Sequence, residues 1–213
     1  MKTAKLIALL ARGVEGVDPA RVRRRFWLAL SAGVVVALVT SVGLLRLNPL
    51  LVHLAMEPGF WVRESFCLTL CVTGIVLVNR LGRPGRGLGL APLGVAIPVA
   101  ALWILAIFIL LAAPPGARAP LIVGHTARAC PFLITLLSAP VFAACIWVLK
   151  DLAPTHLRAA GAGAGFAAGA FGGLAYTLHC PEIAPPFIAV WYLLGMAIPT
   201  LLGAWLGPRL LRW

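Results

Sequence analysis

Six long apolar runs, each close to the length of one membrane crossing, constrain this chain more than any other feature of its sequence. A helix needs about 20 mostly apolar residues to cross the hydrocarbon core of a bilayer. The runs are continuously apolar rather than alternating, so they predict helices and not the strands of a membrane barrel. They extend over Phe26–Leu45, Val62–Asn79, Leu90–Ala113, Ala129–Leu149, Leu157–Leu178 and Phe187–Leu206.

The composition agrees with a chain that is solvated by lipid. Only 11% of the 213 residues are charged and 62% are hydrophobic, whereas about a quarter of the residues of a soluble domain are charged. Soluble enzymes, coiled coils and disordered chains are therefore excluded. We expect an all-α integral membrane protein, a bundle of six transmembrane helices over residues 26–213, preceded by a cytoplasmic segment, residues 1–25, that contains a short helix.

The basic residues predict the orientation of this bundle. If the six runs alternate in direction, fourteen of the 18 lysines and arginines fall on one side of the membrane and four on the other. Lys and Arg accumulate on the cytoplasmic side, so both termini are expected in the cytoplasm. The strong positive charge then reflects orientation, and no direct binding of nucleic acid is expected. Pro84-Gly85 and Pro114-Pro115-Gly116 are typical of turns between helices.

The middle of every apolar run lacks ionisable residues, and Arg63 and Glu64 are expected at an interface. Buried ionisable groups mark the ion paths of pumps and proton-coupled transporters, so the sequence disfavours that class. The chain also lacks a Gly-rich phosphate loop, an H-E-x-x-H motif and a G-x-S-x-G motif. We expect a protein that is not an enzyme and that has no obligatory cofactor.

Three of the five cysteines lie in the interior of apolar runs, away from the run ends. Cys67 and Cys71 are four residues apart and share a helix face, where two thiolates could hold a soft metal such as Cu(I). Packing is the favoured interpretation, because cysteine is a common small apolar residue of buried helices. Cys145 has no evident partner and is interpreted in the same way.

Cys130 and Cys180 are different, because both fall at the outer ends of predicted helices. Each precedes a proline, which favours an extended or turn backbone and is expected to expose the thiol. Three interpretations remain open: a structural disulfide, a pair that senses oxidation or captures a thiophilic metal with His179 as a third ligand, and two unrelated cysteines. Cys130, Cys180 and His179 are thus the candidate metal ligands, with the metal acting as a signal.

A glycine repeat marks the fifth apolar run. Glycine recurs at every fourth position, at Gly161, Gly165, Gly169 and Gly173. Such spacing forms a smooth ridge that lets a neighbouring helix approach closely. Static packing inside the bundle is the favoured interpretation, and a sliding or dimerising face is the alternative.

The N-terminal segment carries a compact apolar patch of four residues, Leu6, Ile7, Leu9 and Leu10. A short helix here could lie on anionic lipid, with the following arginines as an anchor. Alternatively, the helix could dock its apolar face in a groove of a cytosolic protein. The physical chemistry of the segment alone favours the first interpretation.

Several motifs resemble one known family, the NrsF-like (negative regulator of sigma F) integral membrane anti-sigma factors of bacteria. They are the opening Met1-Lys-Thr-x-x-Leu-Ile-x-Leu-Leu10, the arginines before the first run, Cys130-Pro-x-Leu-Ile-x-x-Leu-Leu-Ser138, and Tyr176-x-Leu-His-Cys-Pro-Glu182 followed by Phe187 and Trp191-Tyr192. The resemblance spans nearly the whole chain. The last motif is the most specific, because His-Cys-Pro-Glu is followed by an aromatic pair at fixed spacing.

The resemblance implies a multi-pass protein of the bacterial inner membrane that sequesters an extracytoplasmic-function sigma factor. It also implies release of that partner when Cys130 and Cys180, facing the periplasm, meet heavy-metal or oxidative stress. The patch at Leu6, Ile7, Leu9 and Leu10 would then hold the sigma factor, with membrane lipid as the other partner. The alternatives are a soft-metal transporter or metal-binding protein, and a membrane thiol oxidoreductase, which would prefer a Cys-x-x-Cys pair that this chain lacks.

Overall fold

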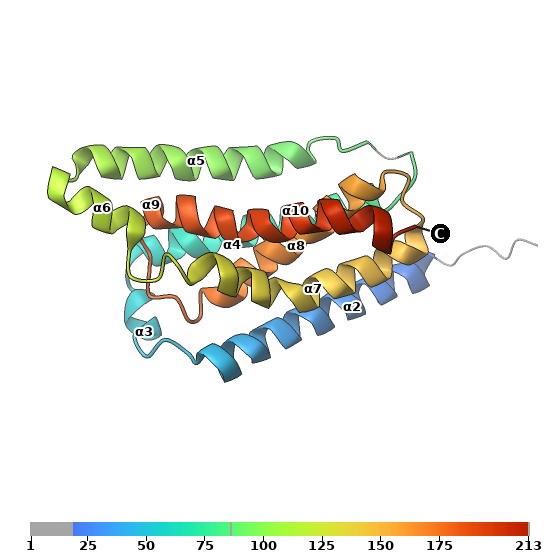
Figure 1. Ribbon diagram of the computed structural model, residues 1–213, viewed down its shortest axis with the longest axis horizontal. Helices are drawn as coiled ribbons and strands as arrows, with labels where there is room; N and C mark the ends of the chain where they lie inside the picture. Colours follow the sequence, from blue (N-terminus) through green and yellow to red (C-terminus); the bar gives the residue numbers. More distant parts are fainter. Residues whose placement is uncertain (1–18, 86, 213) are drawn as a thin grey trace, which may run out of the picture.

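The computed structural model describes residues 19–85 and 87–212, and in that part of the chain all regular structure is helical (Figure 1). The N-terminal patch Leu6, Ile7, Leu9 and Leu10 lies outside the described residues. The long helices are α2 (Pro19–Thr40, continued by the π-helical turn Ser41–Leu45), α4 (Pro58–Leu81), α5 (Ala91–Ala112), α7 (Cys130–Leu152), α8 (Leu157–Tyr176) and α10 (Leu193–Leu210). Short helices are α3 (Leu51–Leu54), α6 (Pro115–Val123) and α9 (Pro185–Phe187), the last joined to α10 by the π-helical stretch Ile188–Tyr192.

Five of the long helices are long and apolar enough to cross a membrane, counting α9 to α10 as one continuous helix. The sixth, α8, is 20 residues long but falls outside this group. Each predicted run matches one long helix to within a few residues at most boundaries. The largest difference is at α2, which begins at Pro19 rather than near Phe26, so the arginines that precede the first run lie on the helix itself.

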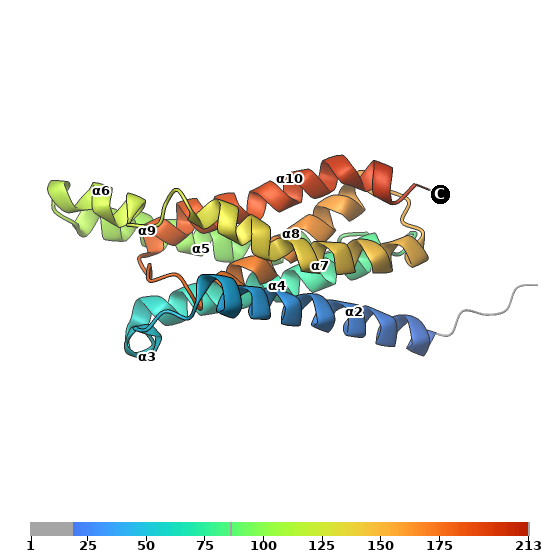
Figure 2. The same ribbon diagram turned by 60° about the horizontal axis from the view of Figure 1, so that its bottom comes forward.

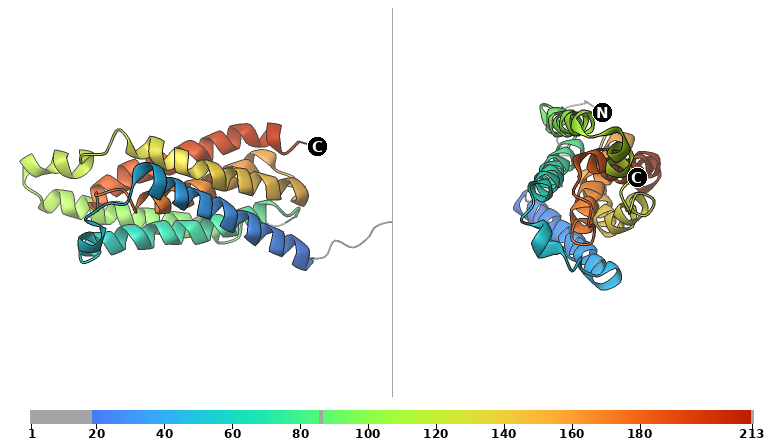
Figure 3. Two further views of the ribbon diagram at one scale, coloured as in Figure 1. Left: turned by 90° about the horizontal axis from the view of Figure 1, so that it is seen from below. Right: turned by 90° about the vertical axis from the view of Figure 1, so that its left-hand side faces the viewer.

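Helix α8 occupies the centre of the bundle. It packs against α10, α7 and α4, and the end-on view shows these helices gathered around it (Figure 3). Most α8 residues are buried, although glycine and alanine provide most of its surface. A helix with so little side-chain volume can be enclosed on all sides because the neighbouring backbones come close to it.

The glycine repeat faces α10. A Cβ added at Gly161 would lie 2.1 Å from the carbonyl oxygen of Gly203, and one added at Gly165 would lie 2.0 Å from that of Pro199. Added Cβ atoms at Gly169 and Gly173 would meet Met196 at 2.9 and 2.6 Å. The ridge is therefore covered by α10 within the chain, which fits the interpretation as packing inside the bundle and leaves no open face for a second copy of the chain.

Helices α2 and α5 lie on opposite sides of the bundle. Helix α2 runs along α7 (Figure 2), whereas α5 contacts mainly α4 and α9.

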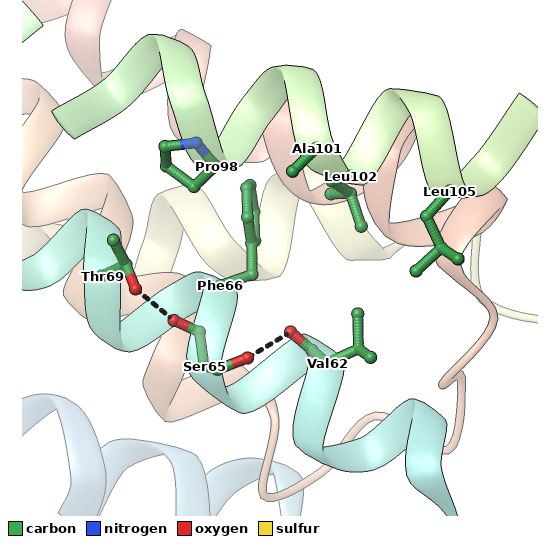
Figure 4. Close-up of a pocket in the computed structure, with 8 residues that line it drawn as sticks. All are labelled: Val62, Ser65, Phe66, Thr69, Pro98, Ala101, Leu102 and Leu105. Carbon is green, nitrogen blue, oxygen red and sulfur yellow. Dashed lines mark hydrogen bonds between the residues drawn. The ribbon is translucent and has the colours of Figure 1, made fainter. Parts of the chain in front are cut away.

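Between α4 and α5 there is an apolar recess of about 200 Å³, into which Phe66 points from α4 towards Pro98 and Leu102 of α5 (Figure 4). The α4 side also carries Ser65 and Thr69, whose hydroxyls donate to the carbonyl oxygens of Val62 and Ser65 in the preceding turn.

The two ends of the bundle differ in charge and in the form of their connections. The start of α2, the ends of α4, α7 and α10, and the start of α8 meet at one end (Figure 1), and we call this the basic end. Its Pro84-Gly85 connection is a turn, as predicted, with Gly85 at φ 75°. The prediction of a turn at Pro114-Pro115-Gly116 is wrong beyond Pro114, because Pro115 starts α6, and proline suits the first helical position.

Candidate functional site

A buried arginine organises the end of the bundle opposite the basic end. Arg63, in the second turn of α4, is 0% exposed. Its guanidinium donates hydrogen bonds to the backbone carbonyl oxygens of Cys180 and Glu182, each at 2.9 Å, and of Thr177 at 3.2 Å. A fourth contact, at 3.3 Å, joins it to the Glu64 carboxylate. The Arg63 side chain therefore holds the connection between α8 and α9 through the backbone carbonyl groups of that connection.

The sequence predicts Arg63 at a membrane interface, and the structure adds that protein encloses the side chain near one end of the bundle. The loop after α8 folds over the guanidinium and supplies carbonyl oxygens in place of water. A buried charge is tolerated only when it is paired and hydrogen-bonded. The loop supplies hydrogen-bond acceptors to Arg63, and the neighbouring Glu64 carboxylate supplies the opposite charge. The signal in the sequence is the pair Arg63-Glu64 in an otherwise apolar run, near the start of the run rather than in its middle.

Cys180 belongs to this loop, and Cys130 lies near it. Both are 0% exposed and both are free thiols, and Tyr176 lies near the two. The hydroxyl of Thr126 lies 3.8 Å from the Cys180 sulfur. The sequence thus placed both thiols correctly at one end of the bundle.

The expectation that these prolines expose the thiols is wrong. Cys130 starts α7, where Pro131 in the first turn is compatible with helix and does not force an extended backbone. Cys180 continues the turn after α8, since its N–H donates to the Tyr176 carbonyl oxygen at 3.0 Å. Because its own carbonyl also accepts from Arg63, the Cys180 side chain is directed into the protein.

Two buried tyrosines complete the surroundings of the thiols. Tyr176, at the end of α8, and Tyr192, before α10, are both 0% exposed, and their ring centroids are 5.9 Å apart. Sequence reasoning used them only as part of a family motif. Their burial makes the surroundings of the thiols aromatic, with the Arg63 guanidinium as the nearby cation.

Glu182 ties the loop to the connection before α7. Its carboxylate accepts a hydrogen bond from the backbone N–H of His125 at 2.7 Å and lies 3.2 Å from the His125 ring. Gly124 makes this approach possible, because its φ is 53° and a Cβ there would lie 2.7 Å from the Glu182 carboxyl carbon. The two segments that carry Cys130 and Cys180 are therefore fastened to each other.

His179 is directed towards a different segment. Its ring Nδ1 lies 3.1 Å from the carbonyl oxygen of Arg46, and the neighbouring Leu178 carbonyl accepts from the N–H of Asn48 at 3.0 Å. His179 therefore joins the loop to the connection after α2. Among residues 19–85 and 87–212, no three His, Cys, Asp or Glu side chains gather as a metal site, so His179 does not form a ligand set with Cys130 and Cys180 in this conformation.

The remaining cysteines line helix contacts. Cys67, Cys71 and Cys145 are free and at most 3% exposed. The Cys67 sulfur packs opposite Gly173 of α8, 4.0 Å from the position that a Cβ would take there. All three are placed as packing residues would be.

The site holds two free thiols, and both are 0% exposed. Burial in apolar surroundings keeps a thiol unreactive, so a reagent has to reach the sulfurs before they can react. The Arg63 guanidinium holds the backbone carbonyl of Cys180. The same guanidinium also holds the carbonyl oxygens of Thr177 and Glu182, on either side of Cys180 in the loop.

Comparison with known proteins gives matches over nearly the whole chain or all of it. A family model described as negative regulator of sigma F, NrsF, matches residues 10–213. A probable anti-sigma-F factor NrsF of Azospira oryzae is 42% identical over 213 residues, with 100% of each chain covered. The anti-sigma-F factor NrsF of Caulobacter vibrioides is 36% identical over 217 residues, again with 100% of each chain covered. No solved structure matches the chain.

These matches extend over the long helices, the Arg63 loop and both cysteines of the site. The family is regulatory rather than enzymatic in kind. The regular structure of the described residues is helical, and five of their helices are able to span a membrane. With a match to this family over its full length, the chain belongs to the negative regulators of sigma F.

Proposed function

We propose that this protein is an anti-sigma factor of the bacterial inner membrane that sequesters an extracytoplasmic-function sigma factor and releases it under heavy-metal or oxidative stress. The observation that carries the proposal is the similarity to two anti-sigma-F factors over 100% of their length. This similarity favours a regulator over a soft-metal transporter.

In the proposed topology, six helices cross the membrane and both termini are cytoplasmic, with residues 1–25 as the cytoplasmic segment and residues 26–213 as the membrane domain. Support comes from the basic end of the bundle, since Lys and Arg concentrate on the cytoplasmic side. Helix α8 is the sixth crossing. It needs little apolarity of its own because α4, α7 and α10 separate it from lipid.

The proposed partner contact is the apolar patch of Leu6, Ile7, Leu9 and Leu10, which docks as a helix on the sigma factor. The sequence supports this role, because the patch is compact and precedes the first crossing on the proposed cytoplasmic side. Membrane lipid and the sigma factor are then the two partners of the chain.

The proposed signal enters at Cys130 and Cys180. A thiophilic metal or an oxidant that joins the two sulfurs must first reach them beneath the loop held by Arg63. The joined pair would shift the loop and the end of α8 relative to α7. Since α8 contacts three other helices, this shift can be transmitted to the basic end, where the sigma factor is held.

The partner contact is tested by co-purification of the sigma factor with the full-length protein from membranes. Leu6→Glu/Leu10→Glu should keep the protein in the membrane and release the sigma factor, because charges replace the apolar contact. Val14→Glu/Val17→Glu, outside the patch on the same segment, is the matched control and should retain the partner. Equal retention by the two variants would contradict the proposed contact.

A further inference from the structure

A basic recess lies at the basic end of the bundle, between the start of α2 and the end of α7. It has a volume of about 600 Å³ and is lined by Ala20, Arg21, Arg24, Arg25, Leu28 and Trp147. The Arg25 guanidinium forms an ion pair with Asp151 at 2.5 Å and lies 4.0 Å above the Trp147 ring. Three arginines thus share the recess with one nearby carboxylate.

An apolar groove continues from this recess along the outer face of α2 and α7. Trp147 lines both. The groove has a volume of about 440 Å³, and its walls are small: Ala29, Ala32, Gly33 and Val36 on α2, and Pro140, Ala143 and Ala144 on α7. Gly33 lets α2 approach α7 closely, because a Cβ at this position would lie 3.0 Å from the Pro140 carbonyl oxygen.

The recess and the groove together match one leaflet of a bilayer in length. From Arg25 to Val36, α2 advances about 16 Å at a rise of 1.5 Å per residue. One leaflet contributes about 15 Å, half of the hydrocarbon core. A molecule with a charged group in the recess would therefore place an acyl chain along the groove down to the bilayer midplane.

The charge of the recess selects the kind of molecule. Arginine binds phosphate through two parallel hydrogen bonds, and basic pockets between helices on the cytoplasmic side suit acidic lipid head groups. Tryptophan is enriched at the membrane–water interface, which is the depth expected for Trp147 at the junction of the recess and the groove. A soluble protein could reach the recess but not a groove that lies at the depth of the hydrocarbon.

We propose that the recess and the groove together form a binding site for an anionic glycerophospholipid of the cytoplasmic leaflet. Arg21 and Arg24 hold its phosphate, Trp147 marks the junction of head group and acyl chain, and the acyl chain follows the surface of Ala32 and Gly33. The site requires that α2 and α7 cross the membrane, and it does not depend on binding of a sigma factor.

The site is tested with the full-length protein in phosphatidylcholine vesicles that contain a minor fraction of phosphatidylglycerol bearing a diazirine on one acyl chain. After illumination, mass spectrometry of peptides locates the lipid adducts. The outer face of α5 provides the internal reference, because Ile104 and Phe108 are exposed on a helix expected to meet bulk lipid.

Adducts should concentrate on the groove residues of α2 and α7 relative to α5. Unlabelled phosphatidylglycerol should compete them away, and phosphatidylcholine should not. Arg21→Gln/Arg24→Gln should lower groove labelling about tenfold, because each arginine near an acidic head group adds to the attraction. Arg118→Gln/Arg128→Gln removes the same charge at the other end of the bundle and should leave groove labelling unchanged. Ala32→Phe, which fills the groove without changing charge, should lower it.

Three results would overturn the proposal. Labelling of α5 equal to that of the groove would show only bulk lipid. Equal competition by both lipids would show an acyl-chain groove without head-group selection. Absence of any groove adduct would show that protein, from this chain or another, fills the site.

Discussion

At the scale of single residues, one arginine connects the chemistry of the site to its structure. Arg63 donates to three carbonyl oxygens of the segment that carries Cys180. The composition of the sequence marks this residue as unusual, but its partners are backbone atoms more than 100 residues away along the chain. Backbone acceptors have no signature in a sequence, which is why the network could not be predicted whereas the two cysteines could.

Replacing Arg63 with methionine should destabilise the protein and open the site. Three buried carbonyl oxygens and Glu64 would lose their donor, at a cost of about 3 kcal/mol. The free energy of unfolding in mixed micelles measures the loss, and the rate at which a water-soluble maleimide labels Cys180 measures the opening. Arg63→Lys should have a smaller effect on both quantities.

Arg128→Met is the matched control, since Arg128 is an exposed arginine near the start of α7. It should change neither the unfolding free energy nor the labelling rate. If Arg63→Met labels no faster than Arg128→Met, the guanidinium does not hold the loop closed.

Cys130→Ser and Cys180→Ser should each abolish induction by metal or oxidant and leave repression intact. Serine is close to cysteine in size but supplies no thiolate, so the bundle is kept and the reactive group is lost. A reporter driven by the sigma factor measures both states. Cys145→Ser changes an equally buried cysteine away from the site and should respond as the unaltered protein does. A full response from either single variant of the pair would place the sensor elsewhere.

At the scale of helices, the packing of α8 on α10 depends on glycine at particular positions. A Cβ at Gly165 would lie 2.0 Å from the Pro199 carbonyl oxygen, whereas one at Gly163 would lie 2.8 Å from the end of the flexible Leu81 side chain. Backbone cannot yield without moving a helix, but a side chain can rotate. The two positions look alike in the sequence and differ in the structure.

Gly165→Ala should therefore lower the unfolding free energy by about 3 kcal/mol, in the upper range for an overpacked core. Gly163→Ala, the same substitution two residues earlier on α8, should lower the unfolding free energy by less than about 1 kcal/mol. Thermal unfolding followed by circular dichroism in detergent compares them. Equal midpoints would mean that α8 and α10 can separate without loss of stability.

Long helices could be predicted closely from the sequence, and short ones could not. Twenty apolar residues have one stable arrangement in lipid, because every backbone group must be hydrogen-bonded within the segment. Short helices such as α6 face no such requirement and depend on local contacts. Pro115 illustrates the limit, since proline suits both a turn and the first position of a helix.

At the scale of the whole molecule, the distribution of charge predicts how the bundle lies in the membrane. The basic end collects the start of α2 and the ends of α4, α7 and α10 (Figure 1), although these segments are far apart in the sequence. The two cysteines of the site lie at the other end. Orientation therefore decides which compartment the thiols meet.

A reporter fused after Trp213 should be active only in its cytoplasmic form. Green fluorescent protein should fluoresce there and alkaline phosphatase should be inactive, because α10 would deliver the C-terminus to the cytoplasm. The same reporters inserted between α5 and α6 should give the opposite pattern, which serves as the control. Phosphatase activity after Trp213 would reverse the topology and place Cys130 and Cys180 in the cytoplasm.

The small side chains of α8 also bear on how the protein is made. During synthesis a segment enters the lipid on its own only if its side chains favour hydrocarbon, and within residues 19–85 and 87–212 α8 is the long helix that falls outside the strongly apolar group. Its most extensive partner, α10, is translated after it. If α8 is the sixth crossing, as we propose, the nascent α8 is expected to stay beside α7 until α10 is made and encloses it, so that a later helix completes the membrane integration of an earlier one.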